Sequence, residues 1–518
     1  MSAADAFYIT TPIYYVNDKP HIGHAYTTIS CDVIARFMRL DGKRVMFLTG
    51  TDEHGQKVAK SAELKGIAPQ AFTDDVSERF RELTKLLNIS NDDFIRTTEP
   101  RHRDACQVLW KTLVDKGEIY LGSYAGWYSV RDEAFYQESE LVGGKAPTGA
   151  EVEWVEEPSY FFRLSAWADR LLAHYERNPE AIQPASRRNE VLSFIRGGLH
   201  DLSVSRTTFS WGVPVPGDPA HVMYVWIDAL TNYLTALGYP DTTDDRFKAF
   251  WPTVHHTVGK DIVRFHAVYW PAFLMAAGLT PPRRVFAHGW WTIEGEKMSK
   301  SIGNTVDPHD LVSTYGLDQT RYFLMREVPF GNDGDFSRQA MIGRINNDLA
   351  NDFGNLVQRV LSMVQKNCGG KVPSPGVDAA LLAQEPLIAD AHGLVERVRP
   401  LIVAQSYHKA LEEIWATVGA ANRYIDREAP WTLRKTDPDA MARVLYILME
   451  TIRHLALVVQ PFLPTSAARV LDFLGVAADD RDFKAVGTAH ALLPGRDIAQ
   501  PQPIFPRIDT SAPAPGAG

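Results

Sequence analysis

Segments of alternating and of helically spaced apolar residues follow one another in the first part of the chain. Residues 7–16 are β-branched and aromatic, as in a strand, and residues 17–20 break that strand. A helix is predicted over about residues 23–40, and residues 44–49, which are apolar at 45–48, follow as a second strand. Strand, helix and strand in this order predict a βαβ unit, and hence a parallel sheet with a right-handed crossover.

Two polar clusters lie where these predicted strands end. The first is His21-Ile22-Gly23-His24, and the second is Thr51-Asp52-Glu53-His54-Gly55. Ligands of open parallel sheets bind outside the carboxyl ends of the strands. We therefore expect both clusters to line a ligand site.

The pattern changes between about residues 117 and 215. Residues 120–136 are dense in aromatic side chains, and the run to Phe162 alternates as in a small antiparallel sheet. Strand-like and helix-like pieces resume over residues 222–326. The middle segment therefore reads as an insertion into an α/β domain.

From Phe336 almost to the end the pattern is helical. Apolar residues recur there at steps of three and four, as at Leu349, Phe353, Leu356, Val360 and Met363. This part is predicted to be an α-helical bundle. The last residues are rich in Pro, Ala and Gly, a composition typical of a disordered tail.

Composition narrows the class of protein only moderately. The 518 residues carry a formal net charge of −9, with 45% hydrophobic and 23% charged residues, as in a globular protein of two or three domains. The negative total argues against nucleic acid as a partner but leaves room for a local basic surface.

Cysteine usage and the absence of long apolar runs favour a cytoplasmic protein. Cys31, Cys106 and Cys368 are too scattered for a disulfide framework, so a reducing cytoplasm is expected. The first residues lack the basic region of a signal peptide, and no apolar run reaches the ~18 residues of a membrane span.

The histidine cluster opens a predicted helix, whose free N–H groups and dipole favour an anion. His21 and His24 can donate to phosphate oxygens as negative charge develops, and Gly23 lets a nucleotide approach the backbone. A histidine pair at a helix start equally fits simple capping when it is taken alone.

A second basic motif lies far downstream at Lys297-Met298-Ser299-Lys300-Ser301, with glycines at 295 and 303 as hinges. A loop that presents ammonium groups can close on the β- and γ-phosphates of a nucleotide and reopen to release pyrophosphate. Taken alone, such a run is more often an ordinary solvated loop. Its presence beside the histidine cluster favours one shared ATP site.

Two further patterns suit nucleotide and RNA contacts. Gly259-Lys260-Asp261 follows a predicted strand, and Asp261 fits either a ribose-binding carboxylate or a helix N-cap. Asn351, Asn355 and Arg359 are spaced i, i+4, i+8, and Trp431 follows a proline, so amides, a guanidinium and a ring are available to unstacked bases. Spacing alone favours a solvated helix face and a half-buried tryptophan.

Other segments accompany these motifs, at residues 11–17, 225–229, 259–263, 421–424 and 429–431. With them the chain resembles the class I aminoacyl-tRNA synthetases, and among them the methionyl-tRNA synthetases, from residue 7 to about 508. The resemblance implies activation of methionine by ATP with Mg²⁺ to methionyl adenylate. It further implies transfer of methionine to the 3′ end of initiator and elongator tRNA(Met).

The resemblance also implies an architecture. It is an α/β fold in which a Rossmann-type parallel sheet is interrupted by a small inserted connective domain and followed by an α-helical anticodon-binding bundle. The expected boundaries are 1–116 and 216–335 for the catalytic halves, 117–215 for the insertion, 336–508 for the bundle and 509–518 for the tail.

A methionine pocket is expected on one predicted helix. Trp226, Ala229, Leu230 and Tyr233 are spaced i, i+3, i+4, i+7 and so share one helix face, a pattern that on its own is more often plain core. The resemblance assigns this face to the methionine side chain, together with Ile13, Tyr15, Ile262 and His266. A thioether packs well against aromatic ring edges.

The remaining roles come from the resemblance alone. Asp52 matches the carboxylate that pairs with the substrate ammonium, and Arg206 matches an arginine near the reacting groups. His21, His24, Lys297 and Lys300 are the catalytic residues, and the nucleotide is bound by these with Gly23, Gly259, Asp261 and Ser299. Asn351, Asn355, Arg359 and Trp431 match the readers of the CAU anticodon.

Two absences are expected. Many relatives carry a cysteine-rich zinc knuckle in the insertion, but no cysteine lies between Cys106 and Cys368, so we expect no structural zinc and no other metal ligands. Many relatives also carry a further C-terminal dimerisation domain. This chain ends in a short tail instead, so we expect a monomer without a membrane partner.

Two rival functions remain open at this stage. The first is another adenylyl-transferring enzyme, either a synthetase for a different amino acid or a small nucleotidyltransferase. The second is a non-catalytic RNA-binding protein on a synthetase scaffold. Methionine-dependent ATP–pyrophosphate exchange separates all three.

Overall fold

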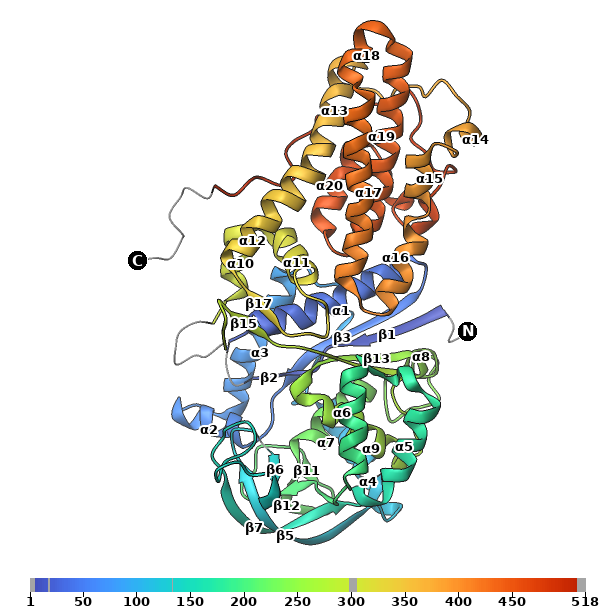
Figure 1. Ribbon diagram of the computed structural model, residues 1–518. Coiled ribbons are helices and arrows are strands. Elements are labelled where there is room, and N and C mark those ends of the chain that lie inside the picture. Colours follow the sequence, from blue (N-terminus) through green and yellow to red (C-terminus); the bar gives the residue numbers. More distant parts are fainter. Residues whose placement is uncertain (1–4, 17–18, 133, 298–304, 510–518) are drawn as a thin grey trace. The chain divides into compact units, whose positions relative to one another are not determined.

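The computed structural model describes residues 5–16, 19–132, 134–297 and 305–509. The chain divides into two compact units. One comprises Met1–Pro20 and Val45–His288, and the other comprises His21–Arg44 and Gly289–Gly518. Figure 1 shows the elements of both.

The first unit contains, among its described residues, a seven-stranded sheet of order β2-β3-β1-β13-β14-β8, with β4 beside β3. The pairs β2/β3, β3/β4, β1/β13, β13/β14 and β14/β8 are all parallel, which confirms the predicted α/β class. The strands are β1 (Ala6–Thr10), β2 (Tyr14–Tyr15), β3 (Arg44–Asp52), β4 (Asp93–Arg96), β8 (Ile182–Gln183), β13 (Val254–Gly259) and β14 (Arg284–His288).

Helices of the first unit bury a large apolar core. Trp110 of α4 and Trp270 of α9 lie in it with Tyr233 of α7, and each is at most 2% exposed. The helices are α2 (Gln56–Leu64), α3 (Pro69–Leu86), α4 (Pro100–Asp115), α5 (Ala168–Arg177), α6 (Ala185–Arg196), α7 (Val225–Thr235), α8 (Asp245–Phe250) and α9 (Trp270–Ala277). Two short turns precede α9, the 3₁₀ turn η6 (Lys260–Ile262) and the π-helical turn η7 (Phe265–Tyr269).

The predicted antiparallel sheet is present within residues 117–215. Its order is β6-β5-β7-β9, from β5 (Ile119–Ser129), β6 (Ala134–Tyr136), β7 (Glu153–Phe162) and β9 (Leu202–Ser203). A second small sheet joins β10 (Ser205–Arg206), β12 (Asp218–Met223) and β11 (Pro214–Val215).

One strand of the segment 117–215 belongs to the parallel sheet instead. Ile182 of β8 pairs with Val285 of β14. A two-residue strand is too short to leave a periodic signal in the sequence, so the pairing of β8 with the parallel sheet was not predicted. The domain boundaries given above therefore stay predictions.

The second unit begins with α1 (Ile22–Leu40), close to the helix predicted over residues 23–40. A three-stranded sheet of order β16-β15-β17 accompanies it, from β15 (Trp291–Ile293), β16 (Glu296–Lys297) and β17 (Gly334–Phe336). Tyr26 of α1 packs edge-on against Trp291 of β15, with ring centroids 5.4 Å apart. Residues 298–301 of the lysine motif lie outside the described residues, as do residues 510–518 of the predicted tail.

The remainder of the second unit is helical, as predicted. Figure 1 shows the long helices α13, α17 and α19 running beside one another, and direct contacts join them. The helices are α10 (Pro308–Tyr315), α11 (Leu317–Arg326), α12 (Arg338–Arg344), α13 (Asn355–Asn367), α14 (Ala379–Leu382), α15 (Pro386–His392), α16 (Leu394–Val403), α17 (Tyr407–Glu428), α18 (Pro430–Thr436), α19 (Pro438–Val459) and α20 (Pro464–Phe473).

Two features refine the predicted bundle. Of its five periodic apolar residues, Leu349, Phe353, Leu356 and Val360 are buried and Met363 is half-buried. The π-helical segment η8 (Ile345–Gly354) lies between α12 and α13. Within the described part of the chain, every helix is too short or too polar to cross a membrane.

Candidate functional site

His21 and His24 cap the first turn of α1 in a reciprocal arrangement. The Nδ1 atom of His21 accepts from the backbone N–H of Gly23 at 3.1 Å, and the N–H of His21 donates to Nδ1 of His24 at 3.0 Å. A neutral imidazole that accepts at Nδ1 carries its proton at Nε2. Both rings therefore have an Nε2–H donor, the form that a phosphate oxygen requires. The sequence left open whether the two histidines cap the helix or bind phosphate. In this geometry each ring can do both, because Nδ1 caps the helix and the Nε2–H group is a donor.

Gly23 is required by the His21 ring itself. A Cβ atom at position 23 would lie 2.9 Å from Cε1 and 3.1 Å from Nδ1 of His21. A side chain here would displace the ring that caps the helix. This adds to the predicted role, in which Gly23 leaves room for a nucleotide.

The start of α1 lies against the segment that follows the lysine motif. The N–H of Ile22 donates to the carbonyl oxygen of Val306 at 3.1 Å. Lys297 ends strand β16, which pairs with β15, and β15 holds Trp291 against Tyr26 of α1. Ser299 and Lys300 fall in the stretch that the structure leaves undescribed. Both flanks of the lysine motif are thus attached to α1.

Asp52 ends β3 and pairs in register with Tyr15 of β2. The next residue, Glu53, is fully buried and receives Nε and Nη2 of Arg96 at 2.6 and 2.9 Å. Thr98 Oγ1 also donates to Glu53, at 2.6 Å. This charge-assisted clamp fixes the end of β3 against the end of β4. No local pattern indicates this clamp, because Arg96 lies in an ordinary strand pattern.

The predicted methionine residues of α7 lie in or beside the apolar core of the first unit. Leu230 and Tyr233 are 1% exposed, and Ala229 is buried on the same helix. Four half-buried residues pack against the core that contains Leu230 and Tyr233; they are Ile13, Tyr15, Trp226 and Ile262. The Trp226 ring stacks on Phe265 at 3.7 Å between centroids. Leu230 and Tyr233 therefore lie in the large apolar core of the first unit, and the four half-buried side chains pack against that core.

His266 completes this group through a hydrogen bond with Tyr233. Its Nδ1 lies 3.0 Å from the carbonyl oxygen of Ile262, and its Nε2 lies 2.7 Å from the Tyr233 hydroxyl. Nδ1 must donate to the carbonyl, so Nε2 accepts from the hydroxyl. Burial lowers the pKa of His266 to about 4, against smaller opposing effects of the Ile262 carbonyl and Asp261. The ring is therefore neutral at physiological pH.

Asp261 lies within η6 and does not cap a helix. Its Oδ1 would lie 2.5 Å from a Cβ atom at Gly259, the last residue of β13. Gly259 is therefore required where the carboxylate folds back over the end of the strand. This position, outside the carboxyl end of a parallel strand, is where nucleotide riboses bind in such sheets.

Arg206 is 2% exposed on β10. Its Nη1 donates to Ser203 Oγ at 2.9 Å and to the Ser205 carbonyl at 2.6 Å. The guanidinium also lies 4.5 Å from the ring centroid of Tyr224, the residue that precedes α7. Arg206 is thus fixed beside the start of α7.

A buried hydrogen-bonded cluster, which the sequence did not predict, lies on the other side of α7. Asp228 accepts from His54 Nδ1 at 2.7 Å and from His102 Nε2 at 2.8 Å. Cys106 Sγ lies 3.2 Å from His102 Nε2. Burial opposes ionisation of Asp228, but His54 and His102 outweigh it and hold the pKa of the carboxyl below its ordinary value.

Three members of this cluster are also residue types that bind metals. Ligand atoms of His102, Cys106 and Asp228 all lie within 4.8 Å of one another. Hydrogen bonds already account for both carboxylate oxygens and for His102 Nε2. Burial, followed by the nearby Asp228 charge, raises the pKa of Cys106, which disfavours the thiolate that a metal needs. The cluster is therefore read as a hydrogen-bond network.

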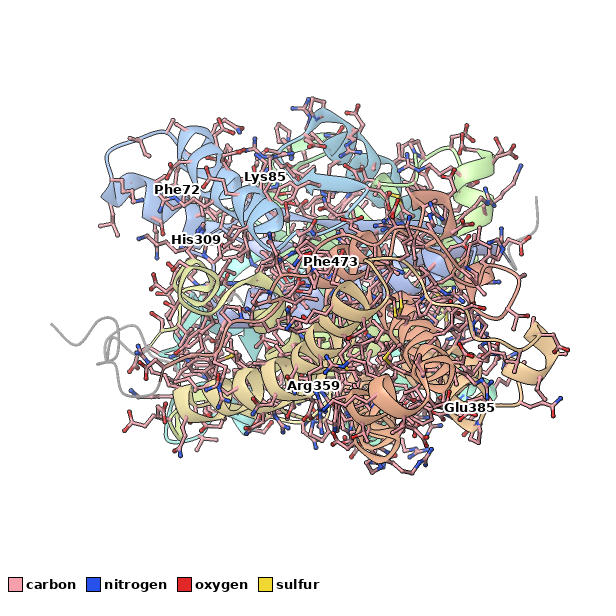
Figure 2. The ribbon with its side chains drawn as sticks, turned by 90° about the horizontal axis from the view of Figure 1, so that it is seen from above. Phe72, Lys85, His309, Arg359, Glu385 and Phe473 are labelled. Carbon is pink, nitrogen blue, oxygen red and sulfur yellow. The ribbon has the colours of Figure 1, made fainter. Side chains whose placement is uncertain are left out.

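Two of the predicted RNA-binding residues, Arg359 and Trp431, lie where α13, α17 and α18 meet. Arg359 of α13, labelled in Figure 2, donates to Asp426 of α17 at 2.7 Å and lies 5.6 Å from the ring centroid of Trp431 on α18. Trp431 is 45% exposed. Asn351 and Asn355 are exposed along η8 and α13, and Asn351 Oδ1 accepts from Arg507 at 3.0 Å.

A surface hollow of about 550 Å³ lies elsewhere, on the first unit. Its lining includes Trp167, Arg170 and His174, but none of the predicted site residues. Its position gives no reason to revise the predicted sites.

Two family models match this chain. The model described as tRNA synthetases class I (M) matches residues 7–152 and 146–361, which together cover more than half of the chain. The model described as the anticodon binding domain of methionyl tRNA ligase matches residues 372–514. Asn351, Asn355 and Arg359 precede the second match, whereas Trp431 lies inside it.

Relatives match over nearly the whole length. The chain is 57% identical to the methionine–tRNA ligase of Rickettsia bellii over 507 residues, 98% of this chain and 99% of that protein. It is 57% identical to the methionine–tRNA ligase of Brucella suis over 508 residues, 97% of this chain and 98% of that protein.

Solved structures also match over nearly the whole chain. One is Mycobacterium tuberculosis methionyl-tRNA synthetase in complex with methionyl-adenylate, with a TM-score of 0.93 and 54% identity over 97% of this chain and 100% of that chain. The apo form of the same enzyme gives a TM-score of 0.87 and 50% identity over 98% of each chain. The chain therefore belongs to the methionyl-tRNA synthetases, a family of class I aminoacyl-tRNA synthetases.

Proposed function

We propose that this chain is a methionine–tRNA ligase that acts in two steps. A carboxylate oxygen of methionine attacks the α-phosphorus of Mg-ATP, the bond to the β-phosphate oxygen breaks, and methionyl adenylate and pyrophosphate form. A hydroxyl at the 3′-terminal ribose of tRNA(Met) then attacks the methionyl carbonyl, and AMP leaves. Initiator and elongator tRNA(Met) are both substrates.

The observation that carries this proposal is family membership over nearly the whole chain. Catalysis rests on positioning and on stabilisation of developing charge rather than on a covalent enzyme intermediate. His21 and His24 donate from Nε2 to the phosphates, and Lys297 and Lys300 supply the positive charge. Gly23, Gly259, Asp261 and Ser299 bind the rest of the nucleotide, with Asp261 on the ribose.

Methionine is bound through its two ends. Asp52 pairs with the ammonium, and Arg206 lies near the reacting carboxylate. The thioether side chain packs among apolar and aromatic groups from four segments, namely Ile13, Tyr15, Trp226, Ala229, Leu230, Tyr233, Ile262 and His266. A neutral His266 that accepts from Tyr233 suits an uncharged side chain better than an imidazolium would.

RNA is recognised in the helical part of the chain. Asn351, Asn355 and Arg359 offer hydrogen bonds to base edges, and Trp431 offers a stacking face worth ~1–3 kcal/mol per base. The enzyme is proposed to act as a cytoplasmic monomer with no structural zinc.

The test of the proposal combines two assays on the same preparations. Methionine-dependent ATP–pyrophosphate exchange reports the first step, and charging of tRNA(Met) reports both. The parent enzyme should be active in both assays, and Lys300→Ala should lose most of its exchange activity. Binding of tRNA without any exchange would indicate the non-catalytic alternative, and exchange stimulated by leucine or valine but not methionine would indicate a different synthetase.

A further inference from the structure

Helix α7 carries functional groups on two faces. Trp226, Ala229, Leu230 and Tyr233 share the face assigned to methionine. Asp228 projects from a different face, towards α4, where its Oδ1 accepts from His102 Nε2 at 2.8 Å. Cys106 of α4 is 3.7 Å from the Asp228 carbonyl oxygen. The back of the methionine helix is therefore anchored on α4 through one carboxylate.

The second oxygen of the same carboxylate reaches the loop after β3. Asp228 Oδ2 accepts from His54 Nδ1 at 2.7 Å, and Asp228 is fully buried. His54 is separated from Asp52, the proposed ammonium ligand, by Glu53 alone, and Glu53 is clamped to Arg96. The short segment 52–54 is thus attached to the end of β4 and to α7, and Trp211 Nε1 also donates to the Glu53 carbonyl oxygen at 2.6 Å.

These contacts link the two halves of the methionine site. Asp52 serves the charged end of the substrate, whereas α7 serves its side chain. The Asp228–His54 hydrogen bond joins the segments that carry these two halves. An ionised carboxylate only accepts hydrogen bonds, so it requires a donor from each imidazole and fixes the orientation of both rings.

We propose that Asp228 is a positioning residue for methionine, which acts through His54 to hold the Asp52 loop in register with the side-chain pocket on α7. This inference rests on the proposed function. Asp228 contacts no reacting atom in this account. Its effect is on the affinity for methionine and not on the affinity for ATP.

The chemistry of the network dictates the variants. Asp228→Asn keeps the shape but presents one amide N–H₂, which cannot accept from an imidazole N–H. His54→Leu removes the donor, whereas His54→Asn places an amide N–H where Nδ1–H stood. Cys106→Ala is the matched control, because it removes a buried member of the same cluster without breaking the Asp228–His54 bond.

We expect Asp228→Asn and His54→Leu to raise the KM for methionine roughly ten- to a hundredfold in ATP–pyrophosphate exchange, with the KM for ATP nearly unchanged. His54→Asn should recover most of the loss, and Cys106→Ala should lower thermal stability without changing the KM for methionine. Equal loss in Cys106→Ala, or a stoichiometric zinc ion in the purified parent, would overturn the inference in favour of a metal or packing role.

A double-variant cycle gives a second readout. If Asp228 acts by placing Asp52, then Asp228→Asn should weaken equilibrium methionine binding much less in an Asp52→Asn background than in the parent. Additive losses would overturn the inference. Should Asp228→Asn fail to fold, the pair His54→Leu and His54→Asn carries the same test.

The proposed function and this inference fail in different ways. A parent enzyme that ignores methionine in the exchange assay overturns both. A parent that uses methionine, with an unchanged KM in Asp228→Asn and His54→Leu, overturns the inference alone.

Discussion

The backbone N–H of Ile22 donates to the carbonyl oxygen of Val306 at 3.1 Å. Ile22 is the second residue of the histidine motif, and Val306 lies just beyond the lysine motif. Two stretches almost three hundred residues apart are therefore joined by a direct backbone contact. This is the relationship that a single ATP site built from both motifs requires.

Gly23→Ala should impair adenylate formation more than it affects folding. Its Cβ would meet the His21 ring at 2.9 Å, so the ring must move from its capping position. We expect exchange activity to fall roughly tenfold or more. The matched control is Gly343→Ala, where a Cβ meets nothing within 4 Å. Equal activity of both variants would remove His21 orientation from the mechanism.

Tyr233→Phe should weaken methionine recognition. The change leaves Nε2 of His266 without its 2.7 Å hydroxyl donor. Loss of one buried hydrogen bond corresponds to about 1 kcal/mol, or roughly a fivefold rise in the KM for methionine. Tyr446→Phe is the control, because it removes a similar buried hydroxyl, which donates to Leu492 at 2.9 Å in the helical part. If the KM for methionine rises equally in both variants, the effect does not come from the Tyr233–His266 hydrogen bond.

Two buried histidines should make the fold acid-labile. Burial lowers the pKa of His266 to about 4, and burial together with Arg453 lowers the pKa of His454 to about 3. In the unfolded chain both return to about 6.5. Between these pKa values the unfolded chain binds more protons than the folded chain. The free energy of unfolding therefore has its full value above about pH 6.5 and decreases as the pH drops towards 4.

The slope is the measurable quantity. Each histidine contributes up to about 1.4 kcal/mol per pH unit within this window. His454→Asn keeps a donor for the Glu450 carbonyl, which Nδ1 now bonds at 2.7 Å, but does not titrate. Denaturant unfolding between pH 4.5 and 6.5, roughly the window set by these pKa values, should therefore show a shallower slope in this variant. An unchanged slope would contradict the assignment of a neutral buried ring.

Trp431→Ala should separate the two steps of the reaction. The exposed ring and the Arg359 guanidinium above it offer a stacking platform. Its loss should weaken the binding of tRNA(Met) by ~1–3 kcal/mol, which corresponds to a rise in the KM for tRNA(Met) of roughly 5- to 150-fold. Methionine-dependent exchange should be nearly unchanged. Trp154→Ala, which removes a tryptophan that is 57% exposed, is the control and should leave both assays unchanged. Equal loss of exchange and charging in Trp431→Ala would argue against RNA contact.

Arg321→Met should destabilise the second unit. Nη2 of Arg321 pairs with Asp32 of α1 at 2.6 Å and also donates to the Pro461 carbonyl at 2.8 Å, in a fully buried position. Removing one partner of a buried ion pair typically costs about 3–5 kcal/mol. The double variant Arg321→Met/Asp32→Leu should be less destabilised than the single one. Denaturant unfolding measures both, and strictly additive losses would show that the pair is not coupled.

The sequence predicted most of the architecture, because long periodic segments carry strong signals. The structure confirms the predicted α1 helix, the parallel sheet and the helical region. The edge strand β8 and the π-helical segment η8 were missed, since a two-residue strand and a widened turn leave the apolar periodicity unchanged.

The site was predicted unevenly for a related reason. Spacing on one helix placed Trp226, Leu230 and Tyr233 on a common face. The network of His54, His102 and Asp228 joins three separate elements, so no local pattern could reveal it. The contact of Gly23 with the His21 ring depends on a side-chain rotamer, which the sequence does not encode locally.

The most direct test of the account is ATP–pyrophosphate exchange by the purified chain with each amino acid in turn. We predict strong stimulation by methionine and little by leucine, isoleucine or valine, with the methionine signal abolished in a His21→Ala/His24→Ala variant that remains folded. Absence of any methionine-dependent exchange, or full activity of that variant, would contradict it.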